Sequence, residues 1–182
     1  MDRISFGARK LETVNVLKLT DKGYLPFKAD LGKFNIYKLY DWNRVETLKD
    51  NWNCKLMDML FERCMDFDFE LNKKSVFFIS EPQKYGAKAD FDPEKVLGTA
   101  LFIQYPLKCF NYLAILQKNP GYITQNNNDL FKHVGQEFLN FFKRAYGQKD
   151  FIVDSAFDAT GFYERCGLKY IEGTRSRYIW KV

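Results

Sequence analysis

Hydrophobic residues recur along this chain at the two-residue spacing of strands in some segments and at the three- to four-residue spacing of helices in others. Unbroken or alternating apolar runs, typical of strands that face a core, occur at 34–40, 75–80, 96–106, 111–120 and 151–157. The run at 34–40 is expected to be the first strand of the main sheet. Strands interleaved with helical patterns predict a mixed fold in which helices flank one sheet.

Two long stretches carry apolar residues at helical spacing. The first runs from about residue 41 to 67, with Asp41 or Asn43 as the residue that caps its start. The second has an apolar stripe from Phe131 to Ala145 and ends at Gly147. Both stripes predict helices that pack one side against the sheet.

Residues 1–32 show a less regular pattern of hydrophobic and polar positions. VNVLKL alternates well enough for a strand, but the residues after it are rich in turn formers, among them Gly23, Pro26 and Gly32. We therefore expect residues 1–32 to be an extension packed on a single domain that spans 1–182.

The segment from Asp158 to the end combines a short helix with two strands. Asp158 can cap a helix of about two turns, Phe162 and Tyr163 give it an apolar side, and Gly167 supplies the left-handed residue that ends it. Two alternating runs, LKYIEG and RYIWKV, come next and predict a pair of strands joined by residues 173–176.

This segment resembles the closing motif of the GNAT superfamily of acyl-CoA-dependent N-acyltransferases. The positions that carry the resemblance are Ala159, Phe162, Tyr163, Glu164, Arg165, Gly167 and Leu168. The resemblance implies a mixed, mostly antiparallel sheet of about six to seven strands flanked by helices. It also implies that Tyr163 lies near the thioester sulfur of acetyl-CoA and protonates the leaving thiolate. The alternative is that Tyr163 is a core aromatic with a hydrogen-bonded hydroxyl.

The same resemblance assigns a cofactor site to the run at 111–120 and the helix after it. The backbone of Ala114, Ile115 and Leu116 would contact the pantetheine arm and the developing oxyanion. The free amides at a helix start suit a pyrophosphate, because they lack internal partners and face an anion with a favourable dipole.

Two alignments of the pyrophosphate loop stay open. In the preferred one the loop consists of Lys132, His133, Val134, Gly135 and Gln136. In the second, Gln125 takes the place of the family's Arg or Gln, and Asn126, Asn127 and Asn128 surround the phosphates. The second alignment brings the negative charge of Asp129 beside the pyrophosphate.

The sequence departs from the family pattern at two places. The loop has few glycines, and Ala156 stands where many members have a cofactor-contacting Asn. These departures favour an alternative in which the chain is a catalytically degenerate GNAT-fold binding module that acts through a protein partner. The main hypothesis is an N-acetyltransferase that moves an acetyl group from acetyl-CoA to a primary amine. The base for that reaction is open, with Glu81 or water as candidates.

Composition narrows the remaining possibilities. The net charge of +5 is spread over the chain without a basic block, so we expect no nucleic-acid partner. The four cysteines and the single histidine, His133, have no metal-ligand spacing, so we expect no metal and read the thiols as reduced. The sequence has neither a signal peptide nor an apolar run that could cross a bilayer, which predicts a cytoplasmic protein without a membrane partner.

Overall fold

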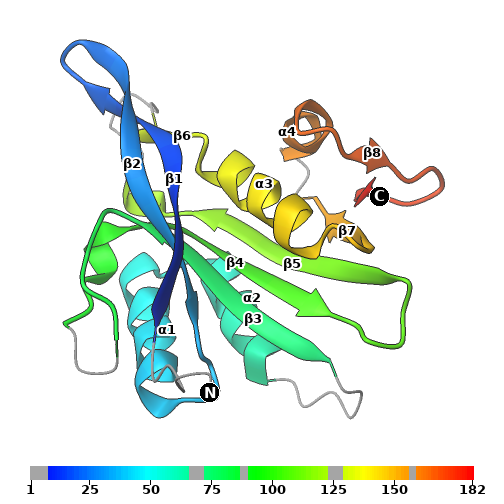
Figure 1. Cartoon of the computed structure of the whole chain (residues 1–182), viewed down its shortest axis with the longest axis horizontal. Coiled ribbons are helices and arrows are strands. Elements are labelled where there is room, and N and C mark those ends of the chain that lie inside the picture. Colours follow the sequence, from blue (N-terminus) through cyan, green and yellow to red (C-terminus); the bar gives the residue numbers. More distant parts are fainter. Residues whose placement is uncertain (1–7, 66–71, 87–89, 123–128, 156–158) are drawn as a thin grey trace.

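The computed structural model describes residues 8–65, 72–86, 90–122, 129–155 and 159–182. Its strands form one nine-stranded sheet in the order β6-β1-β2-β3-β4-β5-β7-β9-β8 (Figure 1). The strands are β1 (Arg9–Thr20), β2 (Gly23–Phe34), β3 (Lys73–Ser80), β4 (Val96–Gln104), β5 (Phe110–Lys118), β6 (Phe131–Lys132), β7 (Asp150–Asp154), β8 (Lys169–Tyr170) and β9 (Arg177–Trp180).

The mixed, mostly antiparallel architecture is confirmed. Every neighbouring pair in the sheet is antiparallel except β5 and β7, which run parallel. The sheet has nine strands among the described residues where about six to seven were expected, because the N-terminal segment contributes a hairpin and β6 is only two residues long.

The N-terminal segment lies within the sheet. We expected residues 1–32 to pack on the domain as an extension, but β1 and β2 pair along their whole length as an antiparallel hairpin, from Arg9–Lys33 to Thr20–Gly23. Gly23, with a φ of 94°, allows the tight connection between the two strands. β2 then pairs with β3, which makes the hairpin part of the main sheet.

The prediction of a strand at 34–40 is wrong. Phe34 is the last residue of β2, and α1 (Leu39–Trp52) begins soon after it. The buried carboxylate of Asp41 accepts hydrogen bonds from the backbone amides of Ala8, at 2.8 Å, and Asn35, at 2.7 Å. Asp41 therefore lies inside the first turn of α1 and fixes the point where the chain leaves the sheet.

The helical stretch expected at 41–67 consists of two helices. α1 ends at Asn53, which has left-handed φ and ψ angles of 39° and 55°, and α2 (Lys55–Met65) starts two residues later. The residue that caps α1 is Lys38, in place of the Asp41 or Asn43 that we expected. The left-handed residue turns the chain so that both helices lie on the same face of the sheet.

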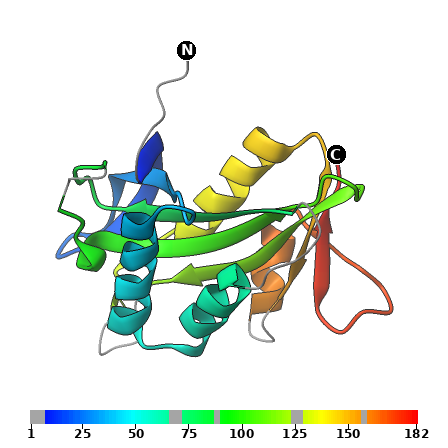
Figure 2. The ribbon, with the colours of Figure 1, turned by 90° about the horizontal axis from the view of Figure 1, so that it is seen from below.

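Two helical layers enclose the sheet, one on each face (Figure 2). α1 and α2 cover one face, where Val45, Leu48 and Leu60 pack with the Phe78 side of the strands. α3 (Val134–Tyr146) covers the other face, where Phe138 and Phe142 are fully buried against Phe77 and Phe102. No helix among the described residues is long and apolar enough to cross a bilayer.

The C-terminal elements follow the predicted order. α4 (Thr160–Arg165) is preceded by Ala159 at its N-terminal cap, and the proposed capping residue Asp158 lies outside the described residues. Gly167 has the expected left-handed φ, +80°, just after the helix. β8 and β9 then pair with each other, and β9 also pairs with β7.

Candidate active site

The parallel strands β5 and β7 separate part-way along their length. β5 pairs with β7 from Phe110 to Leu113, and the last pair joins Leu113 to Val153. β7 ends one residue later, whereas β5 continues to Lys118. No other described strand pairs with this side of β5, so its backbone edge is open from Ala114 onward.

A β-bulge lies where the strands separate. Leu101 of β4 is opposite Ile115 and the next residue, Phe102, is opposite Leu113, so Ala114 is the extra residue. The bulge changes the alternation of side chains, because Leu113 and Leu116 contribute to the α3 side of the sheet and Ile115 to the α1 and α2 side. A bulge at this point re-aims the backbone groups of Ala114 and its neighbours, as bulges near active sites often do.

A cleft of about 590 Å³ lies beside this open edge, between β5 and the two helices α3 and α4. Seven residues predicted from the sequence line it: Leu116, Lys132, His133, Val134, Gly135, Gln136 and Tyr163. Ala114 and Ile115 do not line it with their side chains, and Ile115 is buried in the opposite core layer. Gln125, Asn126, Asn127 and Asn128 of the second alignment lie outside the described residues.

The start of α3 presents free backbone amides. His133 is the N-terminal cap, with a left-handed φ of 69° and no side-chain capping bond, and its carbonyl accepts from the amide of Glu137 at 2.9 Å. None of the described residues accepts a hydrogen bond from the amides of Val134, Gly135 or Gln136. This helix start therefore has the donors and the dipole that suit an anion.

Gly98 brings this helix start close to the sheet. A Cβ at position 98 would lie 2.8 Å from the carbonyl oxygen of Gln117 and 2.8 Å from Cγ1 of Val134. The absence of a side chain on β4 thus lets the first residue of α3 approach β5, which positions the free amides beside the open edge.

The charges around the cleft are mixed. Lys132 and Arg165 line it, and the ammonium group of Lys132 lies 3.9 Å from the centre of the Tyr24 ring. Lys118 and Asp129 also line it and form an ion pair with each other. The carboxylate of Asp129 therefore lies in the cleft formed by the preferred alignment, although the sequence had associated it only with the second one.

Tyr163 is the buried phenol of the cleft. The residue is 5% exposed, and its ring stacks on Tyr178 with the ring centres 5.7 Å apart. None of the described residues forms a hydrogen bond with its hydroxyl group. Burial raises the pKa of Tyr163 above its usual value, and the nearby thiol of Cys166 adds to that effect, so the hydroxyl keeps its proton at neutral pH.

Glu81, the candidate base, lies elsewhere. Glu81 does not line the cleft and forms an ion pair with Lys18 at 3.3 Å. Asp154, at the end of β7, accepts hydrogen bonds from Tyr112 at 2.6 Å and from Arg177 at 2.8 Å. Nothing in the sequence indicated that Tyr112 would contact Asp154, because Tyr112 lies within an ordinary apolar strand.

Among the described residues, no group of three or more His, Cys, Asp or Glu side chains is placed to hold a metal ion.

Comparison with solved structures gives the fold. The crystal structure of Tetrahymena GCN5 matches with a TM-score of 0.52 and 14% sequence identity, covering 93% of this chain and 94% of that one. The chain has a GNAT fold. A crystal structure of nourseothricin acetyltransferase is also matched, with a TM-score of 0.37 and 13% identity over 97% of this chain and 86% of that one. No protein-family model and no curated protein sequence matches the chain.

Proposed function

We propose that this GNAT-fold chain is an N-acyltransferase that moves an acetyl group from acetyl-CoA to a primary amine by direct attack. One observation carries the proposal. A single cleft combines the open edge of β5, the amides at the start of α3 that donate to none of the described residues, and the buried phenol of Tyr163.

These residues fit the parts of acetyl-CoA. The amides of Val134, Gly135 and Gln136 would hold the pyrophosphate, with Lys132 as a nearby cation. The open backbone edge that starts at Ala114 would form hydrogen bonds with the pantetheine arm. Acetyl-CoA supplies the acetyl group as a thioester, a bond that an amine can break without a covalent enzyme intermediate.

The chain then has two chemical tasks. A backbone amide at the Ala114 bulge would donate to the carbonyl oxygen as negative charge develops there. As the acceptor nitrogen forms its bond to the carbonyl carbon, the carbon–sulfur bond breaks and Oη of Tyr163 gives its proton to the sulfur. The proton lost by the nitrogen goes to water, since no unpaired carboxylate among the described residues lines the cleft.

A second candidate function is a binding module that no longer turns acetyl-CoA over and acts through a protein partner. The observation that favours it is Asp129, whose carboxylate lines the cleft in which the pyrophosphate would lie. Its ion pair with Lys118 neutralises that charge and also engages a lysine that could otherwise bind phosphate.

A thiol-release assay separates the two candidates. The protein is incubated with acetyl-CoA and a panel of primary amines, and free CoA thiol is measured with and without each amine. Amine-dependent release that falls in Tyr163→Phe and persists in Tyr170→Phe supports the enzyme, because Tyr170 is 45% exposed on β8 and does not line the cleft. Binding of acetyl-CoA without release in the presence of any amine supports the binding module.

A further inference from the structure

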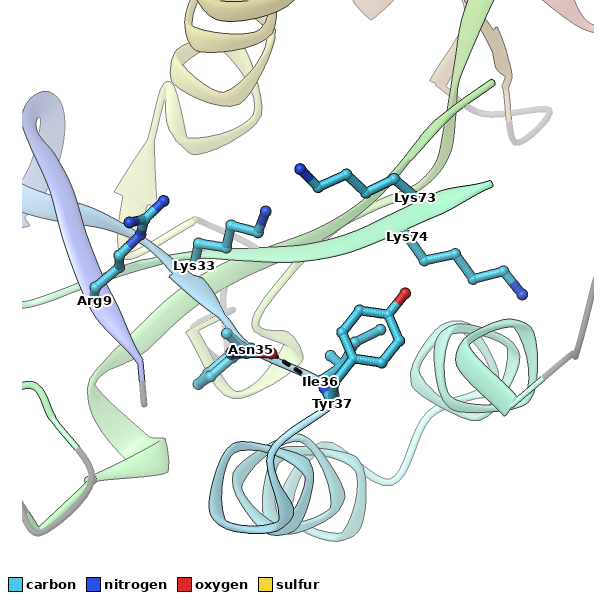
Figure 3. Close-up of a pocket in the computed structure, with 8 residues that line it drawn as sticks. Arg9, Lys33, Asn35, Ile36, Tyr37, Lys73 and Lys74 are labelled. Atoms are coloured by element: carbon cyan, nitrogen blue, oxygen red, sulfur yellow. Dashed lines mark hydrogen bonds between the residues drawn. The ribbon is translucent and has the colours of Figure 1, made fainter. Parts of the chain in front are cut away.

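A second cavity, of about 270 Å³, lies where β2 ends and the chain turns toward α1. Four basic residues line it, Arg9, Lys33, Lys73 and Lys74, and none of the acidic residues that the structure describes does (Figure 3). The pairing of β2 with β3 stops at Phe34 and Val76, so β3 extends past β2 beside this cavity. We call it the basic cavity.

The basic cavity is separate from the cleft described above. Arg9 begins β1, and Leu17 of the same strand is opposite Lys132, which lines the cleft. Leu17 is eight residue steps along the strand from Arg9, a distance of about 26 Å. The two sites share no lining residue.

Three of the cations converge from three neighbouring strands. Arg9 and Lys33 are direct cross-strand partners, an arrangement of like charges that disfavours the pairing of their strands. The side chains of Lys33 and Lys73 point toward one another in Figure 3, whereas Lys74 points away from them. None of the described carboxylates forms an ion pair with Arg9, Lys33 or Lys73.

Lys33 is half-buried, whereas Arg9 and Lys73 are exposed. Its ammonium group lies 5.6 Å from the centre of the Phe77 ring, against which Tyr146 of α3 also packs. Burial, together with the positive charges of Lys73 and Arg9, lowers the pKa of Lys33 to about 8. Perturbed titratable groups that gather in a cavity are a mark of functional sites.

We propose that the basic cavity binds the phosphate group of a small phosphorylated molecule. A phosphate brings the negative charge that these three cations lack among the described residues, and the planar guanidinium of Arg9 can donate two parallel hydrogen bonds to it. The cavity has room for a phosphate and a small attached group. Tyr37, 73% exposed at the rim, offers an aromatic face to that group.

Titration calorimetry with inorganic pyrophosphate at pH 8 and low salt tests the proposal. We expect Lys33→Met to weaken binding about tenfold or more, because it removes the central charge and leaves an apolar side chain over Phe77. The matched control is Lys28→Met, which changes an exposed lysine on the same strand and should alter affinity less than about twofold. Lys132→Met tests whether pyrophosphate binds instead in the cleft between β5, α3 and α4.

Proton uptake gives a second readout. A bound phosphate favours the charged form of Lys33, so its pKa rises on binding and the complex takes up protons at pH 8. Titrations in two buffers of different ionisation enthalpy measure this uptake, which Lys33→Met should abolish and Lys28→Met should keep.

Three results would overturn the proposal. They are no binding of pyrophosphate to the unmodified chain, an equal loss in Lys28→Met, and a loss confined to Lys132→Met. A variant in which Asp66, Asp68 and Glu70 become Asn, Asn and Gln provides a further check. Binding seen only in that variant would show that the cations serve the chain's own acidic stretch.

Discussion

Gly135, in the first turn of α3, lies against the ring of Phe162 on α4, and a Cβ at position 135 would be 2.9 Å from Cζ of that ring. The glycine is therefore needed for the contact between the two helices that form one side of the cleft. This packing role is independent of any contact that Gly135 makes with a phosphate.

Replacement of Gly135 should damage the protein through this contact. We expect Gly135→Ala to lower the free energy of unfolding by about 1–2 kcal/mol, because the Phe162 ring must move from its packed position. The double variant Gly135→Ala/Phe162→Leu should recover most of that loss. Urea denaturation measures both, and an unchanged Gly135→Ala midpoint would contradict the packing role.

The pH dependence of turnover depends on the raised pKa of Tyr163. Because burial keeps the phenol protonated beyond its usual pKa, the rate should show no decline from loss of this acid below about pH 10. Tyr163→Phe should lower kcat about 100-fold at pH 8, with little change in the KM for acetyl-CoA. A descending limb near pH 8 that disappears in Tyr163→Phe would mean that the phenol ionises much earlier.

Asp129 should oppose the binding of acetyl-CoA. We expect Asp129→Asn to tighten binding about fivefold, near 1 kcal/mol, because it removes a negative charge from the cleft and frees Lys118. The control is Asp50→Asn, an exposed carboxylate on α1 outside the cleft. Weaker binding in Asp129→Asn would mean that the ion pair instead holds the cleft in its binding shape.

Asp41 should be essential to the junction between the hairpin and α1. Its fully buried carboxylate pairs with Arg44 at 2.8 Å and accepts from the amides of Ala8 and Asn35. Asp41→Ala should cost about 3 kcal/mol of unfolding free energy, because it leaves buried polar groups without their acceptor. Asp50→Ala on the same helix should cost less than about 0.5 kcal/mol, and a similar loss in both variants would contradict this role.

Much of the fold could be predicted because local pattern and tertiary environment agree. The unbroken apolar runs of β3 and β4 are buried on both faces, and the stripe from Phe131 to Ala145 predicted a helix that packs on the sheet. The N-terminal hairpin was missed because Pro26 and two glycines indicated turns, although the sheet accommodates them. The alternating apolar residues after Phe34 wrongly predicted a strand, because the hydrogen bonds to the Asp41 carboxylate outweigh a weak local preference for strand.

The candidate site was only partly predictable. Tyr163 and the run from Lys132 to Gln136 were found through their resemblance to a known motif, and the structure brings them to one cleft. The bulge at Ala114 depends on register between β4 and β5, which no local pattern reveals. The Lys118–Asp129 pair joins two segments that are distant in the sequence, so it too required the folded chain.

A calorimetric titration with acetyl-CoA of the unmodified chain, Gln136→Pro and Gln136→Ala tests whether the start of α3 holds the co-substrate. Proline is tolerated in the first turn of a helix but removes the backbone amide, whereas alanine removes only the exposed side chain. We predict saturable binding that Gln136→Pro weakens about tenfold or more and Gln136→Ala changes less than about threefold. No binding to the unmodified chain, or equal losses in the two variants, would contradict the claim that the free amides of α3 hold acetyl-CoA.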